Sequence, residues 1–347
     1  MKSKNINIYF IGRRQGHSFY RFFPSKIENL RKDEEIGFKK TNNLSRTHNI
    51  NSANILFYRN KPEKTTDQLV NSLIQQSKKH DDKLVINDIN SFYNYDSKDR
   101  AFKIWQDNNL LCPKFLAFSI LELNDINKIS RKIAKFLKKY KKIILRSNNE
   151  TGSRGLYVID SVNEIDIILI KLKKRINKLV KYRKDTKIIC VEYLETKSTN
   201  GYRDLYRVHV LFNKIICFYV STSKKDILYN SLMSEKEIER FIRKNHEFGL
   251  LLPKVKNDIL KSVEVLGNNI GAVEFFLIKN KPYFIELNPL WGGHAARNGF
   301  GNDNMMTYLL KNKNELINKV PNIYKWLDYK GFYNSIYSNI IDYYNNK

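Results

Sequence analysis

The stretch from Gly271 to Gly293 constrains the fold of this 347-residue chain more than any other. It reads GAVEFFLIKNKPYFIELNPLWGG. Two apolar runs surround a short Lys-Asn-Lys turn centred on Asn280, which is the pattern of a β-hairpin. Around this centre Glu274 lies directly opposite Glu286, and Asn288 shares their face because side chains alternate along a strand. The rest of that face would be apolar: Phe276, Ile278, Pro282 and Phe284.

Two carboxylates facing each other on a sheet need a positive partner. Like charges in opposed positions repel, and aromatic neighbours replace none of the hydration that a carboxylate loses on burial. Glu274, Glu286 and Asn288 form a hard, all-oxygen ligand set that suits Mg²⁺ or Mn²⁺, and such a partly filled shell usually holds nucleotide phosphates. The alternative is that Glu286 caps a neighbouring loop and Glu274 pairs with a lysine.

Composition narrows the class of protein. The chain is 42% hydrophobic and 13% aromatic, which predicts a globular protein of two or three domains. Cys112, Cys190 and Cys217 are odd in number and far apart, so we expect a reduced, cytoplasmic protein. No apolar run approaches the roughly 20 residues of a membrane helix, and we expect no membrane partner.

The formal net charge of +27 suggests anionic partners. The lysines are spread over almost every predicted helix, and no nucleic-acid-binding motif accompanies them. We therefore expect small anionic substrates, and consider nucleic acid unlikely as the main partner.

Residues 1–95 read as an α/β unit. Strands are expected over 6–12, 53–60 and 83–88, with a helix over 67–80, which predicts a largely parallel sheet. Loops at the carboxyl ends of such strands bind ligands, so Arg13, Arg14 and His17 are candidates for substrate contact.

The middle of the chain predicts a second layer of strands and helices. A strand ending near Arg146 leads into the loop Thr-Gly-Ser-Arg-Gly over 151–155. Small residues let a loop backbone approach phosphate oxygens. The alternative is an ordinary hairpin loop, which can have the same composition. A helix over 163–182 is expected to pack through one stripe: Ile167, Ile170, Leu172, Ile176 and Leu179.

The order of these motifs resembles the ATP-grasp superfamily, above all its RimK-type carboxylate-amine ligases. Lys98 opens a helix fifteen residues before Pro113, a lid strand and glycine-containing flap follow, and the chain then reads Glu286-Leu-Asn-Pro. The resemblance implies an α/β fold with a parallel N-terminal domain (1–95), an α+β central lid domain (96–194) and a C-terminal catalytic domain (195–347). The chain departs from the family at Ser97, which replaces an Asp, and at Arg146-Ser147, which replace Lys-Pro.

The resemblance also implies residue roles. Glu274, Glu286 and Asn288 would hold Mg²⁺ or Mn²⁺. Arg207 and Arg297 would act at the reacting groups. ATP would be bound by the helix-start lysine, lid arginine, flap, adenine hinge and ribose acid: Lys98, Arg146, Gly152, Ser153, Arg154, Gly155, Glu192, Tyr193, Leu194 and Asp204.

The activity implied is ATP-dependent formation of an amide or peptide bond from a small carboxylate and an amine, through an acyl phosphate. The alternatives are a phosphotransferase of the same fold acting on a hydroxyl, and a non-catalytic, basic nucleotide-binding protein. Where the family places its acceptor segment, this chain has a charged helix over 234–248, and a second helix is expected over 255–269. The identity of the acid and amine substrates is therefore left open. Whether the chain associates with itself is also left open. His209 is expected to be a packed or surface histidine and not a catalytic one, and His294 is a candidate base.

Overall fold

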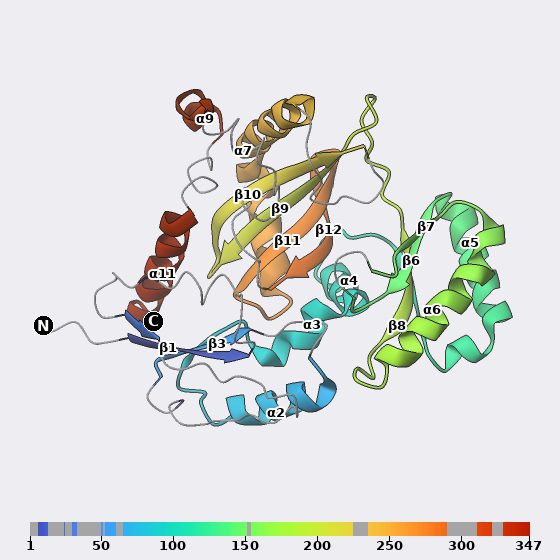
Figure 1. Ribbon diagram of the computed structural model, residues 1–347, viewed down its shortest axis with the longest axis horizontal. Coiled ribbons are helices and arrows are strands. Elements are labelled where there is room, and N and C mark those ends of the chain that lie inside the picture. Colours follow the sequence, from blue (N-terminus) through green and yellow to red (C-terminus); the bar gives the residue numbers. More distant parts are fainter. Residues whose placement is uncertain are drawn as a thin grey trace, which may run out of the picture.

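The computed structural model describes residues 6–12, 24, 30–32, 50, 53–59, 65–150, 154–224, 235–289, 311–320 and 329–347. Within these ranges the chain forms three four-stranded sheets (Figure 1), each built from a different part of the sequence. The fold is mixed α/β, as predicted. The domain boundaries at residues 95 and 194 stay a prediction.

The first sheet is parallel throughout, as expected for a strand–helix alternation. Its strand order is β2-β1-β3-β4, and the short β2 was not predicted. Helix α2 (Asp67–Ser77) joins the last two strands and begins where the Thr66 hydroxyl accepts a hydrogen bond from the Leu69 N–H. The strands are β1 (Ile6–Gly12), β2 (Leu30–Lys32), β3 (Ile55–Arg59) and β4 (Leu84–Ile86). Arg13, Arg14 and His17 lie outside the described residues.

Two short helices lead from this sheet to the second one. They are α3 (Phe92–Asp96) and α4 (Lys98–Asp107), so Lys98 begins a helix as predicted. The second sheet is antiparallel in the order β5-β8-β6-β7. It contains β5 (Phe115–Ser119), β6 (Ile143–Ser147), β7 (Tyr157–Ile159) and β8 (Lys187–Glu192).

Helices α5 (Ile126–Tyr140) and α6 (Ile165–Leu179) pack on this second sheet (Figure 1). The stripe predicted for α6 was wrong at two positions, because Ile167 and Ile170 are 58% and 45% exposed. The buried positions recur every three or four residues, which is the spacing that keeps side chains on one face of a helix. They are Ile165, Ile168, Leu169, Leu172 and Ile176.

The third sheet is antiparallel in the order β10-β9-β11-β12. Its strands are β9 (Arg203–Leu211), β10 (Lys214–Ser223), β11 (Ile270–Ile278) and β12 (Lys281–Asn288). One helix, α7 (Glu235–Glu264), packs against it where two helices were predicted. Pro253 removes one helical hydrogen bond without ending the helix, because apolar residues on both sides of it are buried in the core, including Phe248 and Val255.

The C-terminal helix α11 (Tyr329–Asn345) packs between the first and third sheets, beside β1 in Figure 1. Its buried side chains are Phe332, Tyr333, Ile336, Tyr337 and Ile340. They share one apolar cluster with Ile8 of β1 and Ile270 of β11. A further short helix, α9 (Lys313–Lys319), precedes it. No helix among the described residues has the length and apolarity to cross a lipid bilayer.

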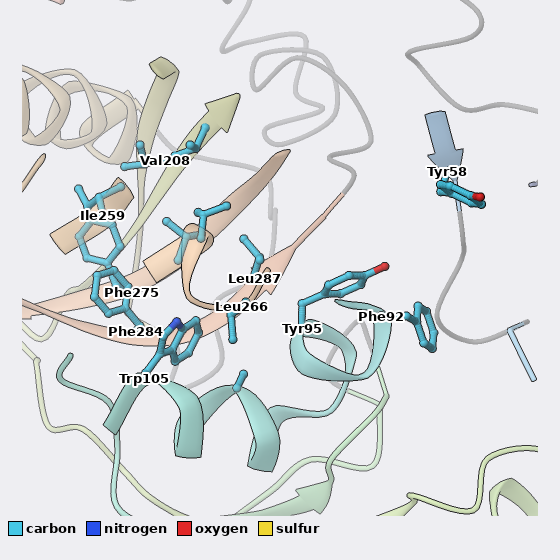
Figure 2. Close-up of a cluster of buried hydrophobic side chains, with 14 of the residues drawn as sticks. Tyr58, Phe92, Tyr95, Trp105, Val208, Ile259, Leu266, Phe275, Phe284 and Leu287 are labelled. Carbon is cyan, nitrogen blue, oxygen red and sulfur yellow. The ribbon is translucent and has the colours of Figure 1, made fainter. Parts of the chain in front are cut away.

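The largest apolar cluster fixes α4 against the third sheet. Trp105 of α4 is fully buried, and its ring lies 5.6 Å from that of Phe284 on β12 (Figure 2). Its indole nitrogen donates a hydrogen bond of 2.8 Å to the Ser262 carbonyl on α7. Because a buried indole N–H needs an acceptor, this bond restricts how α4 can lie. The C-terminal half of α4 is thereby fixed against the third sheet and α7.

Candidate active site

The hairpin places its two carboxylates opposite each other, as predicted, but the length of its turn and the pairing of the residues beside the turn differ from the prediction. The turn has two residues, Lys279 and Asn280, both with positive φ (50° and 61°). Such a turn pairs Phe275 with Phe284, so Phe284 does not share the face of Glu274 as expected. An extra residue, Ile285, forms a bulge that restores the pairing of Glu274 with Glu286.

Glu274 has two partners on its face of the sheet. The Asn288 side-chain nitrogen donates to Glu274 Oε1 at 3.3 Å. Arg207 is the cross-strand neighbour of Glu274 on β9, and its Nη1 lies 3.0 Å from Oε1. The positive partner of Glu274 is therefore an arginine, where the alternative interpretation expected a lysine.

Glu286 is paired with the lysine at the start of α4. Lys98 Nζ lies 3.1 Å from Glu286 Oε1, and its side chain is 5% exposed. The same Nζ donates to the Glu150 carbonyl at 3.2 Å. Arg146 Nη2 donates to that carbonyl at 2.7 Å. The structure thus brings together side chains from five different elements: Lys98, Arg146, Arg207, Glu274, Glu286 and Asn288.

The two carboxylates have opposite pKa shifts. Burial raises the pKa of Glu274 above its ordinary value, with Arg207 opposing the shift and Glu286 adding to it. Burial acts in the same direction on Glu286, but the charges of Lys98 and Arg146 outweigh it and lower the pKa of that carboxyl. Burial also lowers the pKa of Lys98, and the Glu286 charge opposes this.

The donor set of the hairpin fits a hard divalent ion. Glu274, Glu286 and Asn288 supply two carboxylates and an amide, and oxygen donors of this kind suit Mg²⁺ or Mn²⁺. In the site as described, three cationic side chains accompany the two carboxylates, since Arg207 pairs with Glu274, Lys98 pairs with Glu286 and Arg146 lies close by. A group with this charge favours a metal that arrives with an anion such as a polyphosphate.

Comparison with known proteins gave matches only among solved structures. No family model matches the chain, and no curated protein does. D-alanyl-alanine synthetase A from Vibrio cholerae matches with a TM-score of 0.52 at 10% identity, over 83% of this chain and 90% of that one. D-alanine–D-alanine ligase from Bacillus anthracis, complexed with ATP, matches with a TM-score of 0.51 at 10% identity, over 84% and 88%. The VanG D-Ala:D-Ser ligase from Enterococcus faecalis matches with a TM-score of 0.51 at 14% identity, over 83% and 91%.

The chain has an ATP-grasp fold. The second sheet with α5 and α6 lies in the part of the chain where the lid was expected, and β8 leads from it to the third sheet. The lid role of this sheet stays a prediction.

The adenine hinge was expected at the end of β8, where Glu192, Tyr193 and Leu194 were predicted to meet adenine. The backbone N–H groups of Glu192 and Tyr193 donate to the carbonyls of Lys114 and Lys142, at 2.8 and 3.2 Å. These two donors are already used within the protein. The adenine role of the hinge stays a prediction.

Arg203 is a residue at the hinge that sequence reasoning missed. Its Nη2 donates to the Leu194 carbonyl at 2.9 Å. Its guanidinium lies over the rings of Tyr193 and Phe276, at 4.4 and 4.5 Å from their centroids. No motif marks it, because its partners are separated from it in sequence or belong to another strand.

The predicted ribose acid, Asp204, is bound by helix α7. Arg240 Nη2 lies 2.9 and 2.7 Å from the two Asp204 oxygens. Arg240 was also missed, since the charged helix that carries it matched no family pattern. The ribose role of Asp204 stays a prediction.

The flap is described only from Arg154 onward. Gly155 has a φ of +60°, and a Cβ there would lie 2.9 Å from Arg175. Arg175 forms a bidentate ion pair with Glu150, so both ends of the loop are next to one buried contact. Gly152, Ser153, His294 and Arg297 lie outside the described residues.

His209 is packed, as predicted. It is 2% exposed, and its Nδ1 lies 3.1 Å from the Cys217 sulfur on the neighbouring strand. All three cysteines are free thiols and buried.

Proposed function

We propose that this protein is an ATP-dependent ligase that joins a carboxylate to an amine through an acyl phosphate. The observation that supports it most is the convergence of Glu274, Glu286 and Asn288 with buried cations from the lid, from α4 and from β9 within an ATP-grasp fold. Of the three solved structures compared above, two are named as ligases and one as a synthetase, and one of the ligases is complexed with ATP.

The reaction has two steps. An oxygen of the substrate carboxylate attacks the γ-phosphorus of ATP, the bond to the β-phosphate oxygen breaks and ADP leaves. The amine then attacks the acyl carbon of the acyl phosphate, inorganic phosphate leaves, and the amine loses a proton as the amide forms. Phosphoryl transfer asks a protein mainly for positioning and charge neutralisation.

Each group of the site has a defined task in this scheme. Glu274, Glu286 and Asn288 hold magnesium, which when bound neutralises charge on the phosphates. Lys98, Arg146 and Arg207 bind phosphate oxygens, and Arg297 orients the reacting carboxylate. Within the same proposal the hinge binds adenine, Asp204 binds the ribose, and the flap keeps water from the acyl phosphate. ATP, magnesium and reduced thiols suit a cytoplasmic enzyme.

The proposal is tested by product analysis. The protein is incubated with magnesium, ATP and pooled amino acids, dicarboxylates and short peptides, with hydroxylamine present to trap an acyl phosphate. We expect ADP, free phosphate and a hydroxamate, and none of these from the Lys98→Met variant. ADP with a phosphorylated product and no free phosphate would instead identify a phosphotransferase. Absence of ADP with every acceptor pool would indicate the non-catalytic alternative.

A further inference from the structure

Four consecutive residues, from the end of α3 to the first turn of α4, each bond to the second sheet or to a segment next to one of its strands. Asp96 Oδ2 accepts from Arg183 Nη1 at 2.6 Å. The Ser97 hydroxyl donates to the Asp185 carboxylate. The Lys98 N–H donates to the Asn148 carbonyl at 3.0 Å. All four residues of this Asp-Ser-Lys-Asp segment are 5% exposed or less.

The fourth residue completes the attachment. Asp99 Oδ1 accepts from the Asn148 side chain at 2.8 Å, and Asp99 Oδ2 lies 2.6 Å from Lys187 Nζ. Asn148 is fully buried and also donates to the Asp185 carbonyl at 2.9 Å. The position of Lys98 is therefore set by the second sheet as much as by its own helix.

Arg183 is the centre of this attachment. It lies in the segment between α6 and β8 and is 5% exposed. Its fork contacts Asp96 on one side and Asp185 on the other, with Nη2 and Nε each 3.0 Å from an Asp185 oxygen. Asp185 in turn accepts from Ser97, the residue directly before Lys98. One guanidinium thus holds both residues that precede the lysine.

Arg183 also ties this junction to the first part of the chain. Its guanidinium lies 4.9 Å from the centre of the Phe92 ring and 5.2 Å from that of Tyr93, both on α3. Nε lies 3.6 Å from Asp67 Oδ1 on α2. The planar guanidinium can contact two carboxylates and stack on aromatic rings at the same time. A lysine cannot replace it here, because its ammonium is a point charge.

We infer that Arg183 is a positioning residue for Lys98: it sets where α4 begins and so places the lysine against Glu286 and the bound phosphates. The inference rests on the proposed function, because it assigns Lys98 to phosphate binding. It predicts that Arg183 affects nucleotide binding only through Lys98.

The test is a double-mutant cycle on nucleotide affinity. Binding of a non-hydrolysable ATP analogue with magnesium is measured by calorimetry for the unchanged chain, Arg183→Lys, Lys98→Met and the double variant. Arg183→Lys keeps the charge and loses the fork. We expect it to weaken binding about tenfold in the unchanged chain and less than about twofold beside Lys98→Met, since residues in one network are non-additive.

A matched variant separates this effect from loss of stability. Trp105→Phe alters the buried core of the same helix away from its start, so it should lower the melting temperature and leave nucleotide affinity unchanged. If Arg183→Lys does not fold, Ser97→Ala takes its place in the same cycle, because it removes a single hydroxyl and leaves the Arg183 ion pairs intact.

The outcomes separate the positioning role of Arg183 from the phosphate-binding role of Lys98. Equal losses in both backgrounds would overturn the inference and leave the proposed function standing. Unweakened binding by Lys98→Met, or no binding by the unchanged chain, would overturn the phosphate site itself. Coupled losses would establish Arg183 as the residue that positions the lysine.

Discussion

Glu286 and Lys98 form the contact on which the candidate site depends at the scale of single residues. The Lys98 side chain is 5% exposed, and the ammonium has the Glu286 carboxylate and the Glu150 carbonyl as acceptors. A buried ammonium without its carboxylate is costly, so Glu286 stabilises the lysine as well as offering a metal ligand. The two tasks are compatible because a carboxylate has two oxygens and can accept several contacts.

We predict that Glu286→Gln lowers ATP turnover by about 100-fold or more, because an amide carries no charge for magnesium or for Lys98. Initial rates at saturating ATP and magnesium measure this. Glu247→Gln, an exposed carboxyl paired with Lys244, is the control and should leave the rate unchanged. Full turnover by Glu286→Gln would show that the metal site is assigned to the wrong residues.

Two thiols give a second prediction at this scale. Burial raises the pKa of Cys190 to about 12 and that of Cys112 to about 11. Since the thiolate is the reactive form, both should resist alkylation in the native protein at neutral pH and react rapidly after denaturation. Mass spectrometry after iodoacetamide treatment measures this. Rapid native labelling of Cys190 would mean that the core of the second sheet is open.

At the scale of the element, the bulge at Ile285 decides which side chains reach the site. Side chains alternate along a strand, so one residue more or less reverses every side chain beyond it. The two-residue turn alone would pair Glu274 with Ile285 and direct Glu286 to the other face. The bulge shifts the register by one residue, so that Glu274 pairs with Glu286.

Insertion of one alanine between Ile285 and Glu286 should therefore abolish magnesium-dependent nucleotide binding, because Glu286 and Asn288 would leave the face of Glu274. Calorimetric titration with and without magnesium measures the loss. Ile285→Ala keeps the residue count and should bind as the unchanged chain does. If the insertion variant folds and binds with full affinity, the register of β12 does not determine the site.

At the scale of the whole molecule, α11 unites the two ends of the chain. Its five buried side chains lie against the first sheet on one side and the third sheet on the other. The helix makes no contact with the candidate site among those described, and its contribution is the apolar area that it buries between two sheets. We therefore expect substitutions in this helix to lower the stability of the fold and to leave the chemistry of the site unchanged.

Ile336 is fully buried in this contact. We predict that Ile336→Ala lowers the free energy of unfolding by about 2–4 kcal/mol, from lost burial and the cavity left behind. Denaturant titration measures the change. Asn334→Ala on the exposed side of the same helix should change it by less than about 0.5 kcal/mol. At a temperature where the Ile336 variant is folded, its affinity for nucleotide should be unchanged.

The parts of this protein that follow from sequence alone are those that local patterns specify. Strand and helix order and the pairing of Glu274 with Glu286 could be predicted, because alternation and turn residues act over short distances. The start of a helix at Lys98 was implied by the family resemblance. The family resemblance added the order of the motifs, and the fold agrees with it. Tertiary structure alone decided which charges meet. Arg207 on Glu274, Arg240 on Asp204 and Arg183 at the start of α4 join residues distant in sequence, and no local period encodes such contacts. For the same reason the sequence did not predict the packing of α11, because its apolar face contacts two sheets whose strands are distant from it in sequence.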